Sequence, residues 1–503
     1  MKALKPFRAA VVSAAIIYVG GCASPQVGSY DRLSRDIARA DAAYQDLRSS
    51  GVVSYNRAVA GLARQVEDRS PAELREDLAE TDMLLDAPSA KLPFVHFHVV
   101  RPLQPNQLSV GVPVVLEYDT KRTPLYPPEG MLLPATAIYT RVIDKPHLSL
   151  VTERSSVTLN GAEYPLATNY TAPGVMLGHR ARRLARSGFS SMIRPEHMQR
   201  KPQIYLLDPY DPTKIPVLMV HGLQSTPVAF LSLVNALHSN SEIRKHFQIW
   251  QFHYATGTPL LANALTLREQ LARAIREVDP RDQDFATKHI VVLGHSMGGL
   301  IAHTLASSSG KALWSSLFTV PPEKLRGHID TIDELRRVMF FRRNPRVVRL
   351  IFMATPHRGS ILSDTLIGEI GRSLTQLPPV FQTELSELAE SNPSAITPAG
   401  AAFYTRKSVS GVSTLSPRNP SLLALSQLAP GVPFHSIIGQ HRPGPRESGS
   451  DGVVAYTSSH LDGAESELVV RSGHGVVDNP DAEREVIRIL RLEVQSATRR
   501  NQR

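Results

Sequence analysis

Residues 289–298 read His-Ile-Val-Val-Leu-Gly-His-Ser-Met-Gly, an apolar run that ends in a serine between two glycines. The run from Ile290 to Leu293 is typical of a buried strand, and the apolar residues that follow Gly299 are typical of a helix. A strand that turns so sharply into a helix leaves no room for a Cβ on either side of the serine, so both positions need glycine. Such a turn lifts the hydroxyl clear of the sheet. The pattern therefore predicts that Ser296 is a nucleophile.

A second apolar run, residues 215–220, ends in His221-Gly222-Leu223 and predicts another buried strand. A loop in this position supplies one backbone N–H to a negatively charged oxygen, and the residue after the nucleophile supplies another. We therefore expect Leu223 and Met297 to form an oxyanion hole. We expect His221, and His295 beside the nucleophile, to form part of the site wall.

A serine nucleophile of this kind needs a carboxylate and a histidine base, which follow it along the chain. Asp451 comes after the strand-like run 432–439, and His474 lies in a glycine-flanked loop after the run 467–471. We expect Asp451 to be the acid and His474 to be the base. The alternatives that the sequence leaves open are Asp462, Asp478 and Asp481 for the acid, and His435, His441 and His460 for the base.

Four stretches together resemble bacterial lipases and esterases of the α/β-hydrolase superfamily, especially the branch grouped with the GPI inositol-deacylase-like and serine-esterase families. They are residues 210–223, 294–299, 354–360 and 450–454. The family's nucleophile, acid and base correspond to Ser296, Asp451 and His474. In relatives the element at 354–360 lines the site, so the resemblance implies that His357 is a site-wall residue.

These observations indicate a serine hydrolase that cleaves carboxylic esters, as lipases, phospholipases and esterases do, through an acyl-enzyme. An acyltransferase or thioesterase with the same triad is the alternative enzyme, and a catalytically idle envelope scaffold is the alternative from another class. We expect no cofactor and no metal, because the histidines show no H-x-x-x-H or cysteine-paired spacing typical of zinc sites.

The expected architecture is an α/β-hydrolase core, with a mostly parallel sheet and helical cap insertions, behind two accessory regions. Apolar residues three and four positions apart (Ile37, Ala40, Tyr44) predict helices near the N-terminus, and Asn160-Gly161 predicts a hairpin turn in a β-rich stretch. The expected parts are a signal peptide at 1–21, a helical region at 22–90, a β-rich domain at 91–172, and a hydrolase domain at 173–495 with lid insertions near 306–345 and 361–430.

The N-terminus has the pattern of a bacterial lipoprotein signal. Basic residues precede an apolar run too short to span a bilayer, and Val19-Gly20-Gly21-Cys22 resembles a lipobox. We expect Cys22, the only cysteine, to carry lipid such as palmitate and to anchor the protein to a membrane of the cell envelope. In a Gram-negative host this would be the periplasmic face of the outer membrane.

The chain has a formal net charge of +10, with 56 lysines and arginines against 46 acidic residues. Arginines are dense near residues 179–186 and 336–349. Anionic head groups or acidic envelope polymers match this charge better than nucleic acid does in an exported protein. The expected partners are therefore a lipid or acyl-ester substrate and a membrane.

Overall fold

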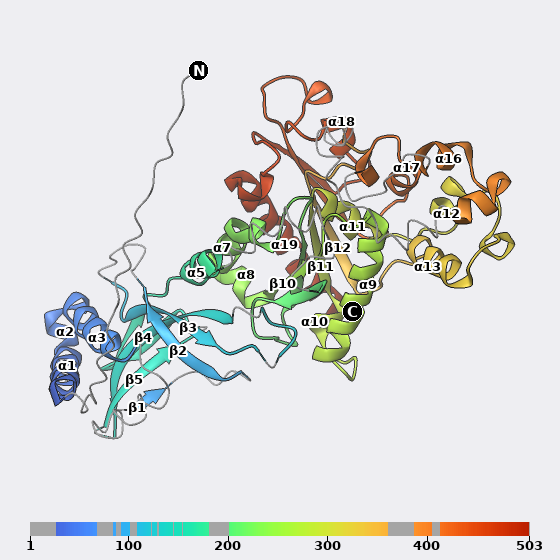
Figure 1. Cartoon of the computed structure of the whole chain (residues 1–503). Helices are drawn as coiled ribbons and strands as arrows, with labels where there is room; N and C mark the ends of the chain where they lie inside the picture. The colour runs from blue at the N-terminus through green and yellow to red at the C-terminus, as the bar shows by residue number, and fades with distance from the viewer. Residues whose placement is uncertain are drawn as a thin grey trace, which may run out of the picture.

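The computed structural model describes residues 27–67, 84–86, 92–100, 108–121, 123–127, 130–143, 145–152, 154–180, 201–360, 387–404 and 413–501. The expected signal peptide and Cys22 lie outside these residues, as do positions 361–386 and 405–412 of the second insertion and positions 181–186 of the first arginine-dense stretch. Figure 1 shows an N-terminal unit of helices and a mostly antiparallel sheet beside a larger sheet flanked by helices. Among the described helices, none combines the length and the apolar character that crossing a membrane requires.

The larger sheet has seven strands in the order β14-β13-β12-β11-β9-β10-β8. All neighbouring strands are parallel except β8 and β10, which are antiparallel. Because parallel strands are joined by crossovers, their carboxyl ends gather at one edge of the sheet. The strands are β8 (Gln203–Leu206), β9 (Ile215–Val220), β10 (Phe247–His253), β11 (Ile290–His295), β12 (Val347–Met353), β13 (Phe434–Gly439) and β14 (Ser466–Val470).

Helices cover both faces of this sheet, which explains why its strands are almost continuously apolar. Leu218 and Val220 of β9 pack toward α9 and α11, and Val217 and Met219 pack toward α7, α8 and α19. Figure 1 shows these two helical layers on either side of the strands. The helices are α7 (Leu231–Ser239), α8 (Ser241–His246), α9 (Leu260–Val278), α10 (Phe285–Lys288), α11 (Met297–Ala306) and α19 (Pro480–Asn501).

Two excursions interrupt the alternation of strands and helices on either side of β12. Their described elements are α12 (Ala312–Leu317), η3 (Pro322–Lys324), α13 (Ile329–Met339), η4 (Pro393–Ala395), α16 (Pro398–Tyr404), η5 (Ser413–Leu415) and α17 (Pro420–Ser426). Some apolar side chains here are buried, with Phe318 8% and Phe341 7% exposed. Others are not: Phe340, Leu423 and Ile329 are 36%, 41% and 68% exposed. The described part of the excursions therefore packs on the fold and leaves a few apolar side chains exposed.

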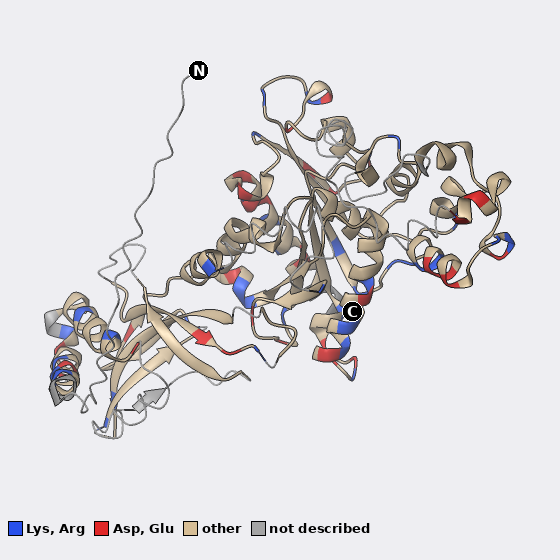
Figure 2. Ribbon diagram, in the orientation of Figure 1, with Lys and Arg blue, Asp and Glu red and all other residues tan. Residues whose placement is uncertain are grey.

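The arginines between residues 336 and 349 are largely paired within the fold. Arg336 and Arg337 contact acidic residues of η3, α9 and α13, and Arg346 contacts Asp282 at 2.8 Å. Arg349 is buried and contacts Glu493 of α19 at 3.0 Å. Figure 2 shows acidic and basic positions interspersed along this part of the ribbon. The charges of Arg336, Arg337, Arg346 and Arg349 are thus partly neutralised within the fold, and the match of this stretch to anionic head groups or acidic polymers stays a prediction.

The N-terminal unit is a five-stranded sheet in the order β1-β5-β4-β3-β2, with a helical pair on it and a separate hairpin beside it. The helices and the sheet, which the sequence indicated as separate regions, share one hydrophobic core. The elements are α1 (Val27–Gln45), α2 (Leu47–Ser50), α3 (Val52–Val66), β1 (Leu84–Asp86), β2 (Phe94–Val99), β3 (Val112–Tyr118), β4 (Met131–Val142), β5 (Lys145–Val151), β6 (Ser156–Leu159) and β7 (Ala162–Pro165).

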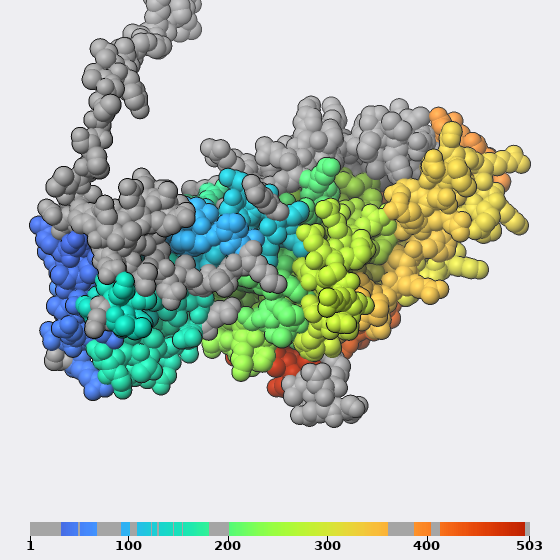
Figure 3. Space-filling view, turned by 90° about the horizontal axis from the view of Figure 1, so that it is seen from below, coloured from blue at the N-terminus to red at the C-terminus, as the bar shows by residue number. Residues whose placement is uncertain are grey.

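Helix α5 (Ala172–Arg180) joins the two units. On one side Ala172 packs with Val115 and Leu132 of the antiparallel sheet. On the other side α5 contacts α7 of the larger unit. Figure 3 shows the N-terminal unit, in blue and teal, as one end of an elongated molecule.

Candidate active site

Ser296 lies at the turn between β11 and α11, in a backbone conformation that few residues other than glycine adopt. Its φ is 54° and its ψ is −128°, and its N–H donates to the carbonyl of Met353 on the neighbouring strand at 2.8 Å. A Cβ on Gly298 would overlap the carbonyl oxygen of Val220, and one on Gly294 would overlap the backbone of Gly299. The turn therefore needs both glycines, as the sequence pattern predicts.

The structure brings Ser296, His474 and Asp451 into one chain of hydrogen bonds. His474 Nε2 lies 2.9 Å from Ser296 Oγ, and His474 Nδ1 lies 2.7 Å from Asp451 Oδ2. Asp451 follows β13 and His474 follows β14, so all three side chains come from the carboxyl edge of the parallel sheet. The arrangement is that of a nucleophile, a general base and a group that orients the base.

The carboxylate of Asp451 is held by its own loop. Its Oδ1 accepts hydrogen bonds from the backbone N–H groups of Val453 and Val454, both at 2.7 Å. The residue is 4% exposed, so Oδ2 faces His474 in a protected environment. These contacts fix the direction of the carboxylate and thereby the imidazole tautomer that it selects.

The expected oxyanion donors lie on the two sides of the Ser296 turn. Met297 is the first residue of α11, where a helix has no internal partner for its N–H groups. Leu223 follows β9, and in the part of the chain that the structure describes no hydrogen bond is recorded from the N–H of either residue. A Cβ on Gly222 would lie 2.8 Å from the Cβ of Ser296, so glycine permits the close approach of this loop.

His295 and His221 are buried behind the hydrogen-bonded chain. His295 Nε2 lies 2.9 Å from the carbonyl oxygen of His474 and so supports the loop of the base. Burial and the nearby His474 lower the pKa of His295 to about 4. His221 stacks on Tyr254 with ring centres 4.3 Å apart, and burial together with His253 lowers its pKa to about 3. Both rings are therefore neutral at pH 7.

His357 lies deeper than a wall residue would. Its ring has no exposed surface and packs edge-to-face against Phe352 and His303. Burial, with His303 and Arg358 nearby, holds its pKa well below the usual range. His221 is equally enclosed. The structure thus places His221 and His357 beneath the surface of the site, where they support it.

The alternative acids and bases make other contacts. His460 interacts with Glu467 and Asp462, and His435 with Arg349 and Ser466. Asp481 pairs with Arg484. The backbone N–H of His441 donates to the carbonyl of Ser450, and Asp478 ends the short helix η7 (Val476–Asp478), where its backbone N–H donates to the carbonyl of Gly475. Among all the candidate acids and bases, the structure connects only His474 to Ser296 and only Asp451 to His474 by hydrogen bonds.

Sequence reasoning missed the residues that hold the acid loop in place. Ser360 Oγ donates to the carbonyl of Val453 at 2.6 Å, and Ser458 Oγ donates to the carbonyl of Gly359 at 2.6 Å. The guanidinium of Arg358 donates to two carbonyls at the end of α18 (Tyr456–Ser459). The stretch 354–360 therefore braces the Asp451 loop. No local pattern signals such contacts, since they join positions about a hundred residues apart.

Comparison with known proteins agrees with this architecture. Residues 211–314 match the family model described as PGAP1-like alpha/beta domain. The chain has an α/β-hydrolase core. The recognition that the motifs indicated is thereby confirmed, and so is the expected fold class. Among curated proteins, no sequence matches this chain.

The α/β-hydrolase core is also similar to solved structures of bacterial esterases and lipases. The mature lipase BlEst2 of Bacillus licheniformis is 13% identical, with a TM-score of 0.32, over 58% of this chain and 99% of its own. Esterase B of Lactobacillus rhamnosis is 10% identical, with a TM-score of 0.32, over 66% and 98%. An enol-lactonase of Burkholderia xenovorans is 14% identical, with a TM-score of 0.31, over 58% and 95%.

Proposed function

We propose that this protein is a serine hydrolase that cleaves carboxylic esters through an acyl-enzyme. The observation that carries the proposal is the hydrogen-bonded chain from Ser296 through His474 to Asp451. The α/β-hydrolase core supports an ester hydrolase activity. Similarity of the motifs to lipases favours a lipid ester as the substrate class.

In the first step His474 Nε2 takes the proton from Ser296 as the hydroxyl oxygen attacks the ester carbonyl carbon. The carbonyl oxygen then carries a negative charge, which the N–H groups of Leu223 and Met297 stabilise. By analogy with other hydrolases, one such donor lowers the activation barrier by roughly 3 kcal/mol. His474 returns the proton to the departing alkoxide, and the acyl group stays on Ser296.

In the second step a water molecule takes the place of the alcohol, and Ser296 becomes the leaving group. His474 removes a proton from the water as its oxygen attacks the acyl carbon, and then protonates Ser296 as the acid leaves. Asp451 remains ionised throughout, because its function is to hold Nδ1–H and to stabilise the imidazolium. Neutral His295 fits this cycle, since a second positive ring beside His474 would oppose its protonation.

Labelling with a fluorophosphonate probe tests the activated serine. We expect the native protein to be labelled and Ser296→Ala not to be labelled. Ser448→Ala is the matched control, because Ser448 is an exposed serine in the loop before Asp451. Equal labelling of Ser296→Ala would show that the reactive serine is elsewhere. A labelled native protein is then assayed with short- and long-chain lipid esters to define the substrate.

We also propose that lipidated Cys22 anchors the enzyme to the cell envelope, on the basis of the lipobox-like sequence. Metabolic labelling with palmitate and separation of membranes test this proposal. The native chain should be labelled and should sediment with membranes, whereas Cys22→Ser should lose the label. Retention of the label in Cys22→Ser would contradict the assignment.

A further inference from the structure

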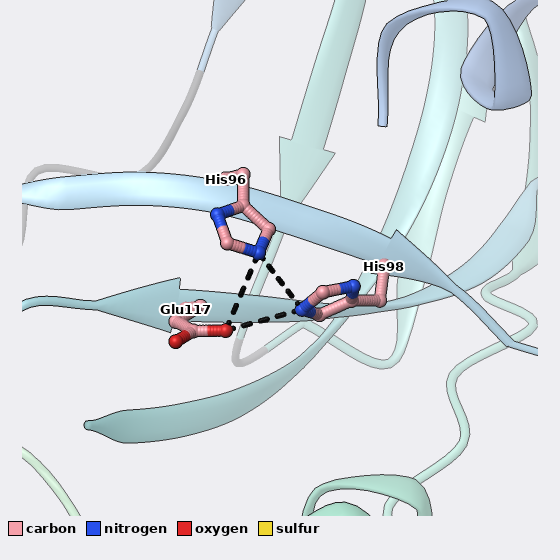
Figure 4. A group of neighbouring side chains, drawn as sticks. All are labelled: His96, His98 and Glu117. Carbon is pink, nitrogen blue, oxygen red and sulfur yellow. Dashed lines mark hydrogen bonds and ion pairs between the residues drawn. The ribbon is translucent and has the colours of Figure 1, made fainter. Parts of the chain in front are cut away.

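Two histidines and a glutamate converge on one face of the antiparallel sheet, away from Ser296. His96 and His98 are two positions apart on β2, so their side chains leave the same face of the strand. Glu117 lies directly opposite His96 on β3. Figure 4 shows the two imidazole rings and the carboxylate directed toward one another. The register of β2 and β3 therefore gathers three side chains of the types that bind transition metals.

The three donor atoms are spaced as metal ligands are. His96 Nε2 lies 3.0 Å from His98 Nε2, and Glu117 Oε2 lies 3.1 Å from His98 Nε2 and 3.4 Å from His96 Nε2. Zinc binds imidazole nitrogen and carboxylate oxygen at roughly 2.0–2.2 Å, which puts tetrahedral ligand atoms about 3.3 Å apart. The triangle of donor atoms matches one face of such a tetrahedron.

A neighbouring arginine fixes the direction of the Glu117 carboxylate. The Arg180 guanidinium contacts both carboxylate oxygens, at 2.9 and 2.6 Å. Arg180 uses one of the two lone pairs of Oε2, and the other faces the imidazoles, where a metal ion would replace the hydrogen bond with His98. Arg180 thus orients the glutamate, as groups that hydrogen-bond to a metal ligand commonly do.

The cluster is accessible without being freely exposed. The side chains of His96, His98 and Glu117 are 30%, 26% and 17% exposed. An ion could therefore enter from solvent and keep a water in its fourth position. Among the strands that the structure describes, β2 lies at the edge of its sheet and has β3 as its only neighbour. An ion shared between these two strands would fasten the edge.

We propose that His96, His98 and Glu117 form a site for one Zn²⁺ ion that ties β2 to β3. Both imidazoles bind through Nε2, and Glu117 binds through Oε2. The site stabilises the N-terminal unit, and the chemistry at Ser296 proceeds without it. This proposal is independent of the proposed hydrolase activity.

Metal binding to the full chain tests the site. The chelator-treated protein is titrated with Zn²⁺, and Co²⁺ absorption reports the ligand geometry. We expect one Zn²⁺ per chain, a higher unfolding temperature with the metal, and a tetrahedral Co²⁺ spectrum. We expect zinc binding to weaken roughly 100-fold or more in each of His96→Ala, His98→Ala and Glu117→Gln. Loss of a group that merely hydrogen-bonds to a metal ligand already costs 10- to 100-fold in affinity.

Two control variants separate this site from others on the chain. His147→Ala removes a histidine of the same sheet, on β5, and should bind zinc as the native protein does. Cys22→Ser removes the only thiol and should also bind normally. Circular dichroism shows whether each variant is folded, and Glu117→Gln preserves the shape of the side chain. No stoichiometric zinc binding, or equal binding by the folded ligand variants, would overturn the proposal.

Discussion

Ser296 acquires its exposed hydroxyl from a strained backbone that its neighbours enforce. A non-glycine residue at φ 54° costs free energy, and such strain persists only where the surrounding structure fixes it. Here the fixing contacts are the bond from Ser296 N–H to the Met353 carbonyl and the tight packing around Gly298. The position of the nucleophile is therefore a property of three adjacent strands.

Asp451→Asn tests how the acid acts on His474. We expect the amide oxygen to keep the bonds from Val453 and Val454, which turns the amide NH2 toward His474 Nδ1. Nδ1 must then accept, so the proton moves to Nε2, and the ring can no longer take the proton of Ser296. Turnover of an ester substrate should fall roughly 10⁴-fold, by analogy with other triads.

The measurement is the steady-state rate on a chromogenic ester, with the unfolding temperature as the control for structure. The variant should unfold near the native temperature, because the amide satisfies the same backbone groups. A rate within tenfold of the native rate would contradict the role of Asp451. The glutamine variant of exposed Asp462 should leave the rate unchanged.

One hydroxyl of helix α3 bonds directly to the backbone of strand β4. Tyr55 Oη donates to the carbonyl of Tyr139 at 2.7 Å and accepts from its N–H at 2.9 Å. β3 pairs with β4 only as far as Ala137, so Tyr139 lies beyond the end of the neighbouring strand. The Tyr55 hydroxyl bonds to the backbone N–H and carbonyl of Tyr139, which a neighbouring strand would otherwise pair. This contact adds to the apolar packing that joins the helices and the sheet.

Tyr55→Phe should therefore destabilise the N-terminal unit. The change leaves both backbone groups of Tyr139 without this partner in a buried place, at a cost of about 1–3 kcal/mol. Urea unfolding followed by circular dichroism measures the difference. Tyr164→Phe, at a partly buried tyrosine of the same unit, is the control and should change the stability little. Equal effects of the two changes would contradict the proposed contact.

The helix α19 is fastened to the larger sheet by a buried ion pair. Glu493 has no exposed surface and contacts Arg349 of β12 at 3.0 Å. Removing one charge of a buried pair costs about 3 kcal/mol or more, because the other charge stays desolvated. We expect Glu493→Gln to lower the free energy of unfolding by this amount.

A second glutamate provides a matched comparison for Glu493. Glu242 contacts Arg491 of the same helix at 2.7 Å, but both side chains are about half exposed. Glu242→Gln should cost at most about 1 kcal/mol, since solvent screens exposed pairs. If the two variants lose the same stability, burial does not determine the strength of these pairs.

The strands and the fold class could be predicted because apolar runs and the Ser296 turn are local patterns. The chain order of nucleophile, acid and base also directed attention to Asp451 and His474. Contacts set by register or by distant loops could not be predicted in this way. Glu117 meets His96 only through the pairing of β2 with β3, and Ser360 meets Val453 only when two loops fold together. The same limit hid the contact between Tyr55 and Tyr139.

Across the whole molecule, buried histidines make folding depend on pH. Burial lowers the pKa of His221 to about 3 and those of His295, His303 and His435 to about 4, from 6.5. In the unfolded chain these rings titrate near 6.5. Between pH 6.5 and 4 the unfolded state therefore binds more protons than the folded state. Stability is complete above pH 6.5 and is lost as the pH falls toward 4.

We expect each of these histidines to cost about 2 kcal/mol of stability between pH 7 and pH 5, so that together they make the protein acid-labile. His460 acts in the opposite sense, because its hydrogen bond to Glu467 raises its pKa, but it is one group against these four and His357. The carboxyl of Glu117, with a pKa of about 2, loses its contribution only below about pH 4.5. Urea unfolding at pH 7, 6 and 5 measures the slope.

His303→Gln separates one histidine from the rest. The glutamine amide can still donate to the carbonyl of Leu428, which His303 Nε2 contacts at 2.9 Å, but it does not titrate. The variant should therefore lose about 2 kcal/mol less than the native protein between pH 7 and pH 5, even if it is less stable at pH 7. A native protein equally stable at pH 7 and pH 5 would contradict the argument, because four buried neutral rings must each gain a proton on unfolding.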